Sequence, residues 1–306
     1  MRQNGDFMDF TSVIEAKNIR KDFKNFSLNV PEFKLPKGFA TALIGENGAG
    51  KTTLLNILTG IRLDYKGEIR YFDKFNENDL ENNPVVKESI GYTGTDNYYF
   101  PHWTVGQVEE LSSLLFKNFN SEKFRNRCKE LAIFGAGTFD KNKKVSTLSD
   151  GTKTKLMLAG ILARETEVLI MDEPASPLDP LMRDKLCELI REYLSSGENK
   201  SVFFSTHNIS DMENVTDYAI IMEHGQIVEQ GFVEDLKEKY IAVKGEAQDA
   251  SKAKEILYTM SSSNYGFEGI CLAKDLDKLA GMDITTETAS LFKISVAIMK
   301  KNSLIQ

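Results

Sequence analysis

The segment that decides the fold reads Gly45-Glu46-Asn47-Gly48-Ala49-Gly50-Lys51-Thr52. It matches the phosphate-binding loop pattern G-x-x-x-x-G-K-[ST] at every specified position. A strand-like run, Ala40–Ile44, precedes it, and the apolar stretch Leu54–Leu58 continues as an expected helix. The glycines let backbone N–H groups turn toward phosphate at the positive end of that helix. The segment therefore predicts a site for a nucleoside triphosphate.

Each polar residue of this loop has an expected task. The Lys51 ammonium would lie on the β- and γ-phosphates, and the Thr52 hydroxyl would complete the coordination shell of Mg²⁺. We expect contacts to the nucleotide from Gly45, Glu46, Asn47, Gly48, Ala49, Gly50, Lys51, Thr52 and Thr53.

Two later strand ends carry acidic and imidazole side chains. The apolar run Val168–Met171 is followed by Asp172 and Glu173. Neighbouring residues of a strand point to opposite sides, so Asp172 can face Mg²⁺ while Glu173 polarises an attacking water. The alternative is an acidic pair that merely ends a strand. His207 follows the run 202–206, where we expect it to face the γ-phosphate.

The composition excludes several classes of protein. The 306 residues carry 38 Lys and Arg against 45 Asp and Glu, and this net charge of −7 argues against a nucleic-acid partner. No apolar run approaches the ~18 residues of a membrane span, and the N-terminus lacks the apolar core of a signal peptide. Three widely spaced cysteines predict neither a disulfide framework nor a zinc site. We therefore expect a cytoplasmic protein.

Strands alternating with helices predict an α/β fold with a parallel sheet. Strand-like runs recur at 13–19, 202–205 and 218–222, besides the two already named. Apolar residues between Met182 and Leu194 recur with helical spacing. Residues 218–228 read as an edge hairpin. Neither proline nor arginine occurs from Gly231 to Gln306, so we place a domain boundary at residue 230.

At this point the order and spacing of the motifs resemble the ATP-binding-cassette (ABC) ATPases over residues 13–230. Leu148-Ser149-Asp150-Gly151-Thr152 resembles the family's signature sequence, and Ala175–Asp179 resembles the loop after the catalytic glutamate. His207 matches the family's switch histidine. The resemblance implies a P-loop NTPase fold in residues 1–230, with a helical subdomain inserted at about residues 90–165.

The resemblance also implies a mechanism. Two cassettes would form a head-to-tail dimer with ATP between them, and Ser149 and Gly151 of one protomer would cap the γ-phosphate bound by the other. Phe23 sits where the family stacks an aromatic ring on adenine. Asp172 would hold Mg²⁺, Glu173 would orient the water, and His207 would support the γ-phosphate.

This sequence departs from the family pattern at several positions. Thr95 stands where the family has a glutamine that contacts Mg²⁺ and water, and Asp96 is a possible substitute. Asp150 and Thr152 replace the signature's first glycine and its glutamine. We expect Asp150 to point away from ATP or to help cap the helix start. Together these departures predict a working but slow site, and the alternative is a degenerate subunit paired with a better one.

The resemblance finally implies a transporter. A single cassette without a spanning helix resembles the ATPase subunit of a multi-chain transporter, as a homodimer or heterodimer on the inner face of the membrane beside an integral permease. The aromatic stretch Tyr92–Trp103 would receive a cytoplasmic helix of the permease, or else form part of the helical subdomain's core. Residues 231–306, an expected α+β accessory domain, resemble the tails of bacterial drug or bacteriocin exporter ATPases, which favours export of a peptide or drug-like compound. The alternatives are an importer subunit and a soluble cassette ATPase that works without a permease.

Overall fold

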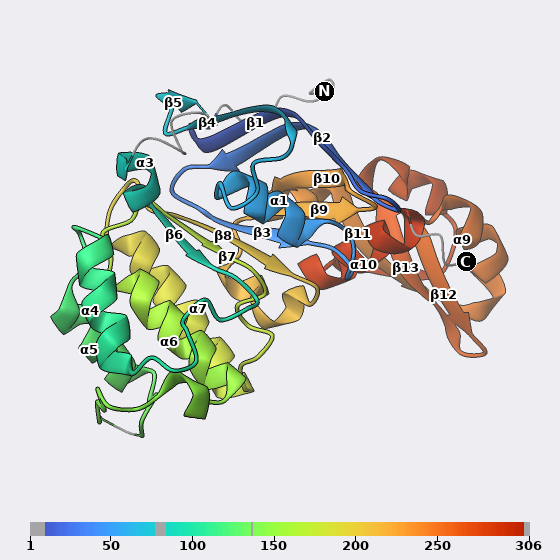
Figure 1. The fold of residues 1–306 in the computed structure, drawn as a ribbon. Coiled ribbons are helices and arrows are strands. Elements are labelled where there is room, and N and C mark those ends of the chain that lie inside the picture. Colours follow the sequence, from blue (N-terminus) through green and yellow to red (C-terminus); the bar gives the residue numbers. More distant parts are fainter. Residues whose placement is uncertain (1–9, 77–83, 136, 303–306) are drawn as a thin grey trace.

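The computed structural model describes residues 10–76, 84–135 and 137–302, whose strands form three sheets (Figure 1). The central sheet has six strands in the order β10-β9-β3-β8-β7-β6. Their bounds are Gln226–Phe232, Tyr218–Glu223, Ala40–Ile44, Ser201–Thr206, Val168–Met171 and Ile90–Thr93. All neighbours pair in parallel except β10, which pairs with β9 as the predicted hairpin. The expected α/β fold with a parallel sheet is therefore confirmed.

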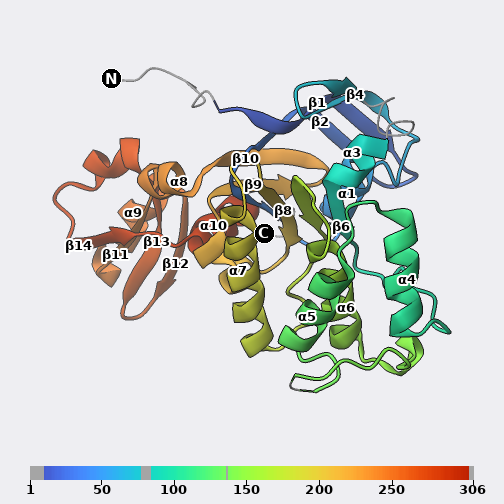
Figure 2. The ribbon, with the colours of Figure 1, turned by 90° about the vertical axis from the view of Figure 1, so that its left-hand side faces the viewer.

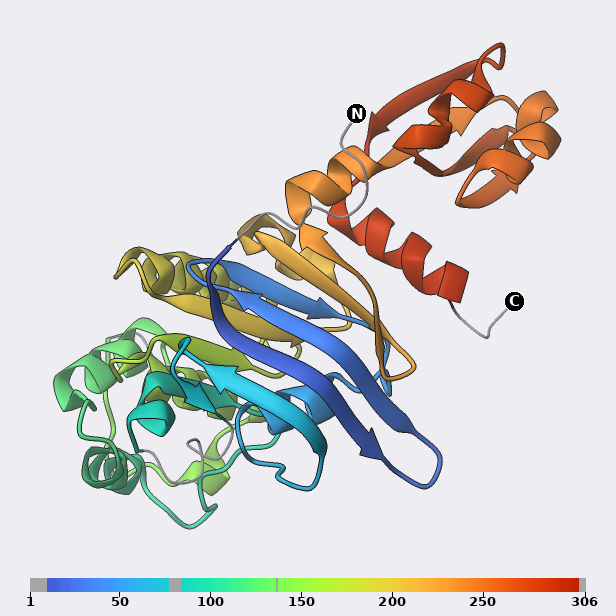
Figure 3. The same cartoon turned by 90° about the horizontal axis from the view of Figure 1, so that it is seen from above.

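The inner strands of the central sheet are buried because both faces are covered. Every residue of β3, β7, β8 and β9 is buried, as continuous apolar runs predict. Helix α1 (Lys51–Leu58) lies between this sheet and an antiparallel sheet in the order β2-β1-β4-β5 (Figure 3). The strands of the second sheet span Ser27–Pro36, Ser12–Asp22, Lys66–Tyr71 and Phe75–Asn76.

Helices cover the opposite face and extend away from it (Figure 2). Helix α7 runs over Pro180–Ser195, with Asp179 as its N-cap, because the Asp179 side chain accepts the Met182 N–H at 3.0 Å. The remaining helices of this region are α3 (Pro84–Ser89), α4 (Val105–Leu115), α5 (Ser121–Glu130), the short η1 (Val145–Thr147) and α6 (Asp150–Leu162). Strand β6 lies within the segment expected as a helical subdomain, yet it pairs with β7 of the central sheet.

The C-terminal segment forms a third, antiparallel sheet in the order β12-β13-β11-β14. Its elements are α8 (Val233–Lys239), β11 (Tyr240–Gly245), η4 (Ala247–Asp249), α9 (Ala250–Ile256), β12 (Thr259–Ser263), β13 (Gly266–Leu272), η5 (Ala273–Leu279), β14 (Ile284–Thr288) and α10 (Leu291–Asn302). Helix α10 returns to the main body, where Leu291 and Ile294 belong to the same buried cluster as Ile221 of β9. The boundary at residue 230 stays a prediction, and β10 runs through it to Phe232.

No helix in the described ranges is both long and apolar enough to span a bilayer. Cys128, Cys187 and Cys271 are all buried free thiols.

Candidate nucleotide-binding site

The phosphate loop joins β3 to α1 at the carboxyl edge of the central sheet, as the motif predicted. Gly48 and Gly50 have φ angles of 89° and 104°, in the left-handed region that favours glycine. A Cβ on Gly45 would lie 2.3 Å from the carbonyl oxygen of Met222. The three glycines are therefore required by the backbone path itself. Glu46 and Asn47 are exposed, Ala49 is buried, and Thr53 lies half-buried in α1.

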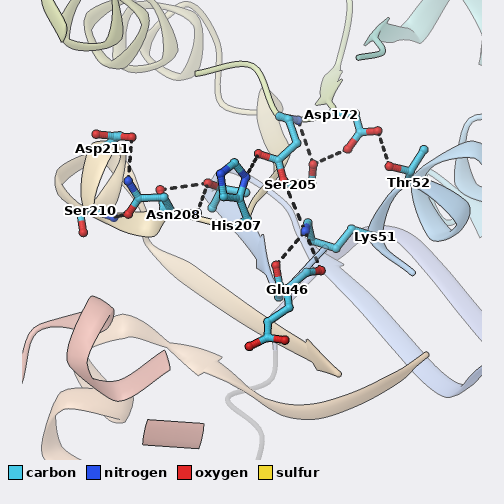
Figure 4. A network of polar contacts seen from close by, with 12 residues as sticks. Glu46, Lys51, Thr52, Asp172, Ser205, His207, Asn208, Ser210 and Asp211 are labelled. Carbon is cyan, nitrogen blue, oxygen red and sulfur yellow. Dashed lines mark hydrogen bonds and ion pairs between the residues drawn. The ribbon is translucent and has the colours of Figure 1, made fainter. Parts of the chain in front are cut away.

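Lys51 lies inside the loop. Its side chain is 6% exposed. The ammonium donates to the carbonyl oxygens of Gly45 at 2.7 Å and Glu46 at 3.2 Å. It also lies 3.3 Å from Glu173 Oε1. The first turn of α1 and the loop carbonyls thus hold the cation toward the carboxylates that follow β7 (Figure 4).

Thr52 and Asp172 are brought together across the sheet edge. The Thr52 hydroxyl donates to Asp172 Oδ2 at 2.7 Å. Asp172 is 2% exposed, its Oδ1 accepts the Ser205 hydroxyl, and its backbone N–H donates to the Thr93 carbonyl at 2.8 Å. A hydroxyl and a carboxylate side by side are hard oxygen donors of the kind that Mg²⁺ binds together with substrate phosphates. The two residues therefore fit the metal that the sequence predicted.

Glu173 lies between Lys51 and His207. Its Oε2 is 2.8 Å from His207 Nδ1, and its backbone N–H donates to Ser205 Oγ at 2.9 Å. Asp172 and Glu173 make separate contacts, but strand alternation is not the cause. Strand β7 ends at Met171, and Glu173 has a φ of 49°, so the backbone at Glu173 is in the left-handed region and does not continue the strand.

A cavity of about 290 Å³ opens beside these carboxylates. Thr95 contributes to its wall, and Asp96, the other candidate for the missing glutamine, is not among its lining residues. The cavity is lined by Asn47, Thr93, Gly94, Thr95, Thr154, Asp172, Glu173, Pro174, Ser176, Pro177 and His207.

Phe23 lies just beyond β1 and is 41% exposed. Its ring is 5.9 Å from that of Phe26, and Lys21 Nζ and the Arg62 guanidinium each lie 5.4 Å from its centroid. The Phe26 ring approaches Gly50 so closely that a Cβ there would lie 2.8 Å away. An exposed aromatic face is thus connected to the phosphate loop through one intervening ring.

The signature segment lies at the start of α6. Ser149 is the N-cap, and its Oγ accepts the Thr152 N–H at 3.3 Å. The helix begins at Asp150. Asp150 points into solvent with its side chain 90% exposed, and its 2.8 Å contact with Lys153 lowers the pKa of its carboxyl. Gly151 packs on the carbonyl of Pro177, which would lie 2.7 Å from a Cβ.

The single chain does not bring every predicted residue together. Ser149 and Gly151 are absent from the lining of the cavity beside Glu173, although Thr154 of the same helix contributes to it. Sequence reasoning also missed Ser205, which joins Asp172 to Glu173 through its hydroxyl. A signal was present, since Ser205 is a polar residue at the carboxyl end of an apolar predicted strand.

Comparisons with known proteins agree with this geometry. Residues 28–176 match the sequence family described as ABC transporter. The chain is 29% identical over 216 residues to the thiamine import ATP-binding protein ThiQ of Jannaschia sp. (strain CCS1), covering 71% of this chain and 91% of that protein. It is 25% identical over 267 residues to the energy-coupling factor transporter ATP-binding protein EcfA2 of Lactobacillus johnsonii, covering 82% and 90%.

Solved structures show the same fold. The ATP-binding cassette MJ0796 bound to ADP and Pi superposes with a TM-score of 0.61 at 22% identity, covering 72% of this chain and 98% of that one. Residues 28–176 thus match the ABC transporter family, the fold is that of a P-loop ABC ATPase, and the chain is an ATP-binding ATPase.

Proposed function

We propose that this chain is the ATP-hydrolysing subunit of a multi-chain membrane transporter, seated on the inner face of the membrane beside an integral permease. The observation that carries the hydrolytic half of the proposal is the position of the Glu173 carboxylate between Lys51 and His207. An apolar groove lined by Tyr98, Trp103 and Leu115 supports the association with a permease.

Different residues of the site would bind the nucleotide, hold Mg²⁺ and activate the attacking water. The ammonium of Lys51 and the loop N–H groups would bind the phosphates, and Phe23 would stack on the adenine. Thr52 and Asp172 would hold Mg²⁺, which when bound supplies charge stabilisation at the phosphate oxygens. Glu173 would orient the attacking water and accept its proton, while His207 fixes the Glu173 carboxylate through their 2.8 Å contact.

Turnover would need a second cassette. Ser149 and Gly151 lie outside the cavity beside Glu173 in the single chain, so a partner protomer, identical or a sibling, would bring its own signature helix to the phosphates. Thr95 lies on the cavity wall and would contact the water that the family's glutamine contacts, with Asp96 as the alternative. The shorter reach of Thr95 supports a slow site.

An apolar groove of about 390 Å³ supports the docking of a permease helix. Trp103, Tyr98 and Leu115 contribute to it, and the last two are 47% and 71% exposed. Tyr99 is buried at 8% exposure and packs in the core. The aromatic stretch therefore contributes both to the subdomain core and to an open surface. From the sequence alone, these two roles were alternatives. Exposed aromatic grooves of this kind suit an amphipathic helix.

We infer the direction of transport from the names of the similar proteins. ThiQ is named for thiamine import and EcfA2 for an energy-coupling factor transporter. These names favour the importer alternative over export of a peptide or drug-like compound, and we propose an importer subunit.

Co-purification tests the permease. A tagged Glu173→Gln chain is expressed in its native cell, and the membranes are solubilised with ATP present. A co-purifying polytopic membrane protein would support the proposal, and a chain found only with soluble companions would favour the soluble cassette ATPase. Leu115→Asp should abolish this association without loss of ATP binding. Leu181→Asp, at a leucine that is 78% exposed outside the groove, is the matched control.

A further inference from the structure

The C-terminal sheet has two unlike faces. One face is covered by α9 and η5, and Val243, Phe267 and Leu279 form a buried cluster there with at most 4% exposure each. The other face is covered by α10, whose Ala297 is buried. The cover is incomplete, because a cavity of about 260 Å³ remains between the strands and α10.

The cavity is apolar at its base. Ala242 of β11 and Ile270 of β13 are each 4% exposed, and Ala297 of α10 is 2% exposed. Met260 and Phe292 stand at its sides, and Phe292 is 43% exposed. Buried apolar residues below and partly exposed apolar residues around the opening would receive the body of a small organic molecule.

The charged side chains that line the cavity include one more lysine than glutamate. Lys244 and Lys293 both approach Glu287, each at 3.1 Å, so two ammonium groups share one carboxylate. Glu268 lies opposite Lys244 in the β11–β13 register. Lys300 also lines the cavity, and its ammonium has no ion pair or hydrogen bond to any residue that the structure describes. Three lysines against two glutamates give this lining a net charge of +1.

We propose that this cavity binds a small organic monoanion with an apolar body, and that its occupancy acts on the His207 segment through α10. The apolar base would hold the body of the ligand, and Lys300 would pair with its anionic group. The second half of the proposal rests on the proposed role of His207, whereas the binding half does not.

The connection to His207 is short. The N–H groups of Leu291 and Phe292, in the first turn of α10, donate to the Glu213 carboxylate at 2.8 and 3.3 Å. Phe292 therefore lines the cavity and is anchored to Glu213 at the same time. Glu213 begins η3 (Glu213–Val215), which Met212 joins to η2 (Ile209–Asp211), and Asn208 joins η2 to His207 (Figure 4). A shift of α10 on ligand binding would be transmitted to the segment that carries His207.

Binding is tested on the full chain with ¹³C-methyl-labelled methionine. Phenylacetate should shift the Met260 methyl resonance, assigned with Met260→Leu, and should leave that of the buried Met157 in place. The isosteric neutral probe phenylacetamide should bind about tenfold more weakly, since it lacks the charge that pairs with Lys300. Lys300→Gln should weaken phenylacetate binding to the same degree, whereas Lys301→Gln on the same helix should not. An unmoved Met260 resonance, or equal binding of the two probes, would overturn the site.

The proposed transmission from the cavity through α10 and Glu213 to His207, here called the relay, is measured separately from ligand binding. The chain has three histidines, so the His207 imidazole resonance can be assigned with His207→Gln. Phenylacetate should shift it, and should change the rate of phosphate release from ATP. Glu213→Ala should retain the Met260 shift and lose both effects. A Met260 shift without a His207 shift would overturn the relay and leave the site standing. A chain that shows both shifts but does not hydrolyse ATP would count against the proposed function alone.

Discussion

At the scale of single residues, the site depends on how Glu173 is held. Its φ of 49° puts a non-glycine residue in the left-handed region, at a cost of about 1–2 kcal/mol. The N–H bond to Ser205 Oγ and the contacts of its carboxylate with Lys51 and His207 hold this conformation. The fold thus maintains a strained backbone in order to place one carboxylate, as is common at functional sites.

Glu173→Gln keeps the shape of the side chain and removes its basicity. We expect phosphate release to fall by at least about 100-fold, because a general base contributes at least that much. ATP binding should persist, since the loop and Lys51 are untouched. Phosphate release and nucleotide affinity are measured on the same preparation. Glu165→Gln, at a carboxylate that is 69% exposed, is the control, and normal turnover by Glu173→Gln would refute the assignment of the base.

Glu223 gives the protein a pH dependence of stability. It is 4% exposed at the end of β9, and its Oε1 has no hydrogen-bond partner among the described residues. Burial raises the pKa of this carboxyl above its ordinary value of 4.5. The native state therefore binds the proton more tightly than the unfolded state. It follows that the free energy of unfolding falls as pH rises from 4.5 through the raised pKa.

Glu223→Gln should remove this dependence. The variant should be more stable than the wild type above that pH window, because the neutral amide does not ionise in its buried position. Urea unfolding between pH 4 and 8 measures the difference. Glu255→Gln, at an exposed glutamate of α9, should follow the wild type. Parallel curves for wild type and Glu223→Gln would show that the pKa of this carboxyl does not differ between the native and unfolded states.

At the scale of elements, the end of α5 offers a stability test. The N–H groups of Ala132 and Ile133 donate to the carbonyls of Lys129 and Cys128, which is the Schellman arrangement. Ala132 occupies its left-handed position with a φ of 49° and is exposed. Ala132→Gly should stabilise the protein by about 1 kcal/mol, because glycine has no Cβ to strain there.

The measurement for this helix end is the shift in the urea midpoint. Ala159→Gly, inside α6 where alanine is favoured, should act in the opposite direction and cost about 1 kcal/mol or more. If both glycines destabilise the protein equally, the end of α5 is not held in the left-handed conformation.

Elements differed in how well the sequence predicted them, for physical reasons. The strands β3, β7 and β9 were predicted because burial on both faces demands continuous apolar runs. Helix α7 was predicted from its periodicity. Strand β2 was missed because Pro31 interrupts its alternation of apolar and polar residues. Strand β6 was missed because Gly91 and Thr93 interrupt its short apolar run.

Some residues of the candidate site were predicted from local motifs, and others were not. Local motifs predicted Lys51, Thr52, Asp172, Glu173 and His207, and the structure brings these five together. The position of Ser205 at the end of an apolar run marked it as a candidate, but its bridge from Asp172 to Glu173 depends on contacts between segments distant in sequence. The roles of Ser149 and Gly151 depend on a second chain, so they stay predictions.

At the scale of the whole molecule, helix α10 packs the C-terminal segment against the ATPase body. Ile294 and Ile298 of α10 are 0% and 1% exposed, and they belong to the buried cluster that also contains Ile221 of β9 and Val233 of α8. Glu213 fixes the start of the same helix. A boundary drawn from composition at residue 230 therefore separates residues that share one core.

This shared core predicts that the ATP-binding part loses stability without α10. Ending the chain after Phe232, or Ile294→Ala in the full chain, should lower the free energy of unfolding of that part by at least about 2 kcal/mol, since each leaves a cavity or exposes the core. Trp103, the single tryptophan, packs against that core and reports its unfolding by fluorescence in urea. Leu279→Ala, in the separate cluster under α9, should leave the Trp103 transition in place. An unchanged transition in the shortened chain would mean that α10 merely rests on the ATPase body, and the relay from the C-terminal cavity to His207 would then lack its rigid element.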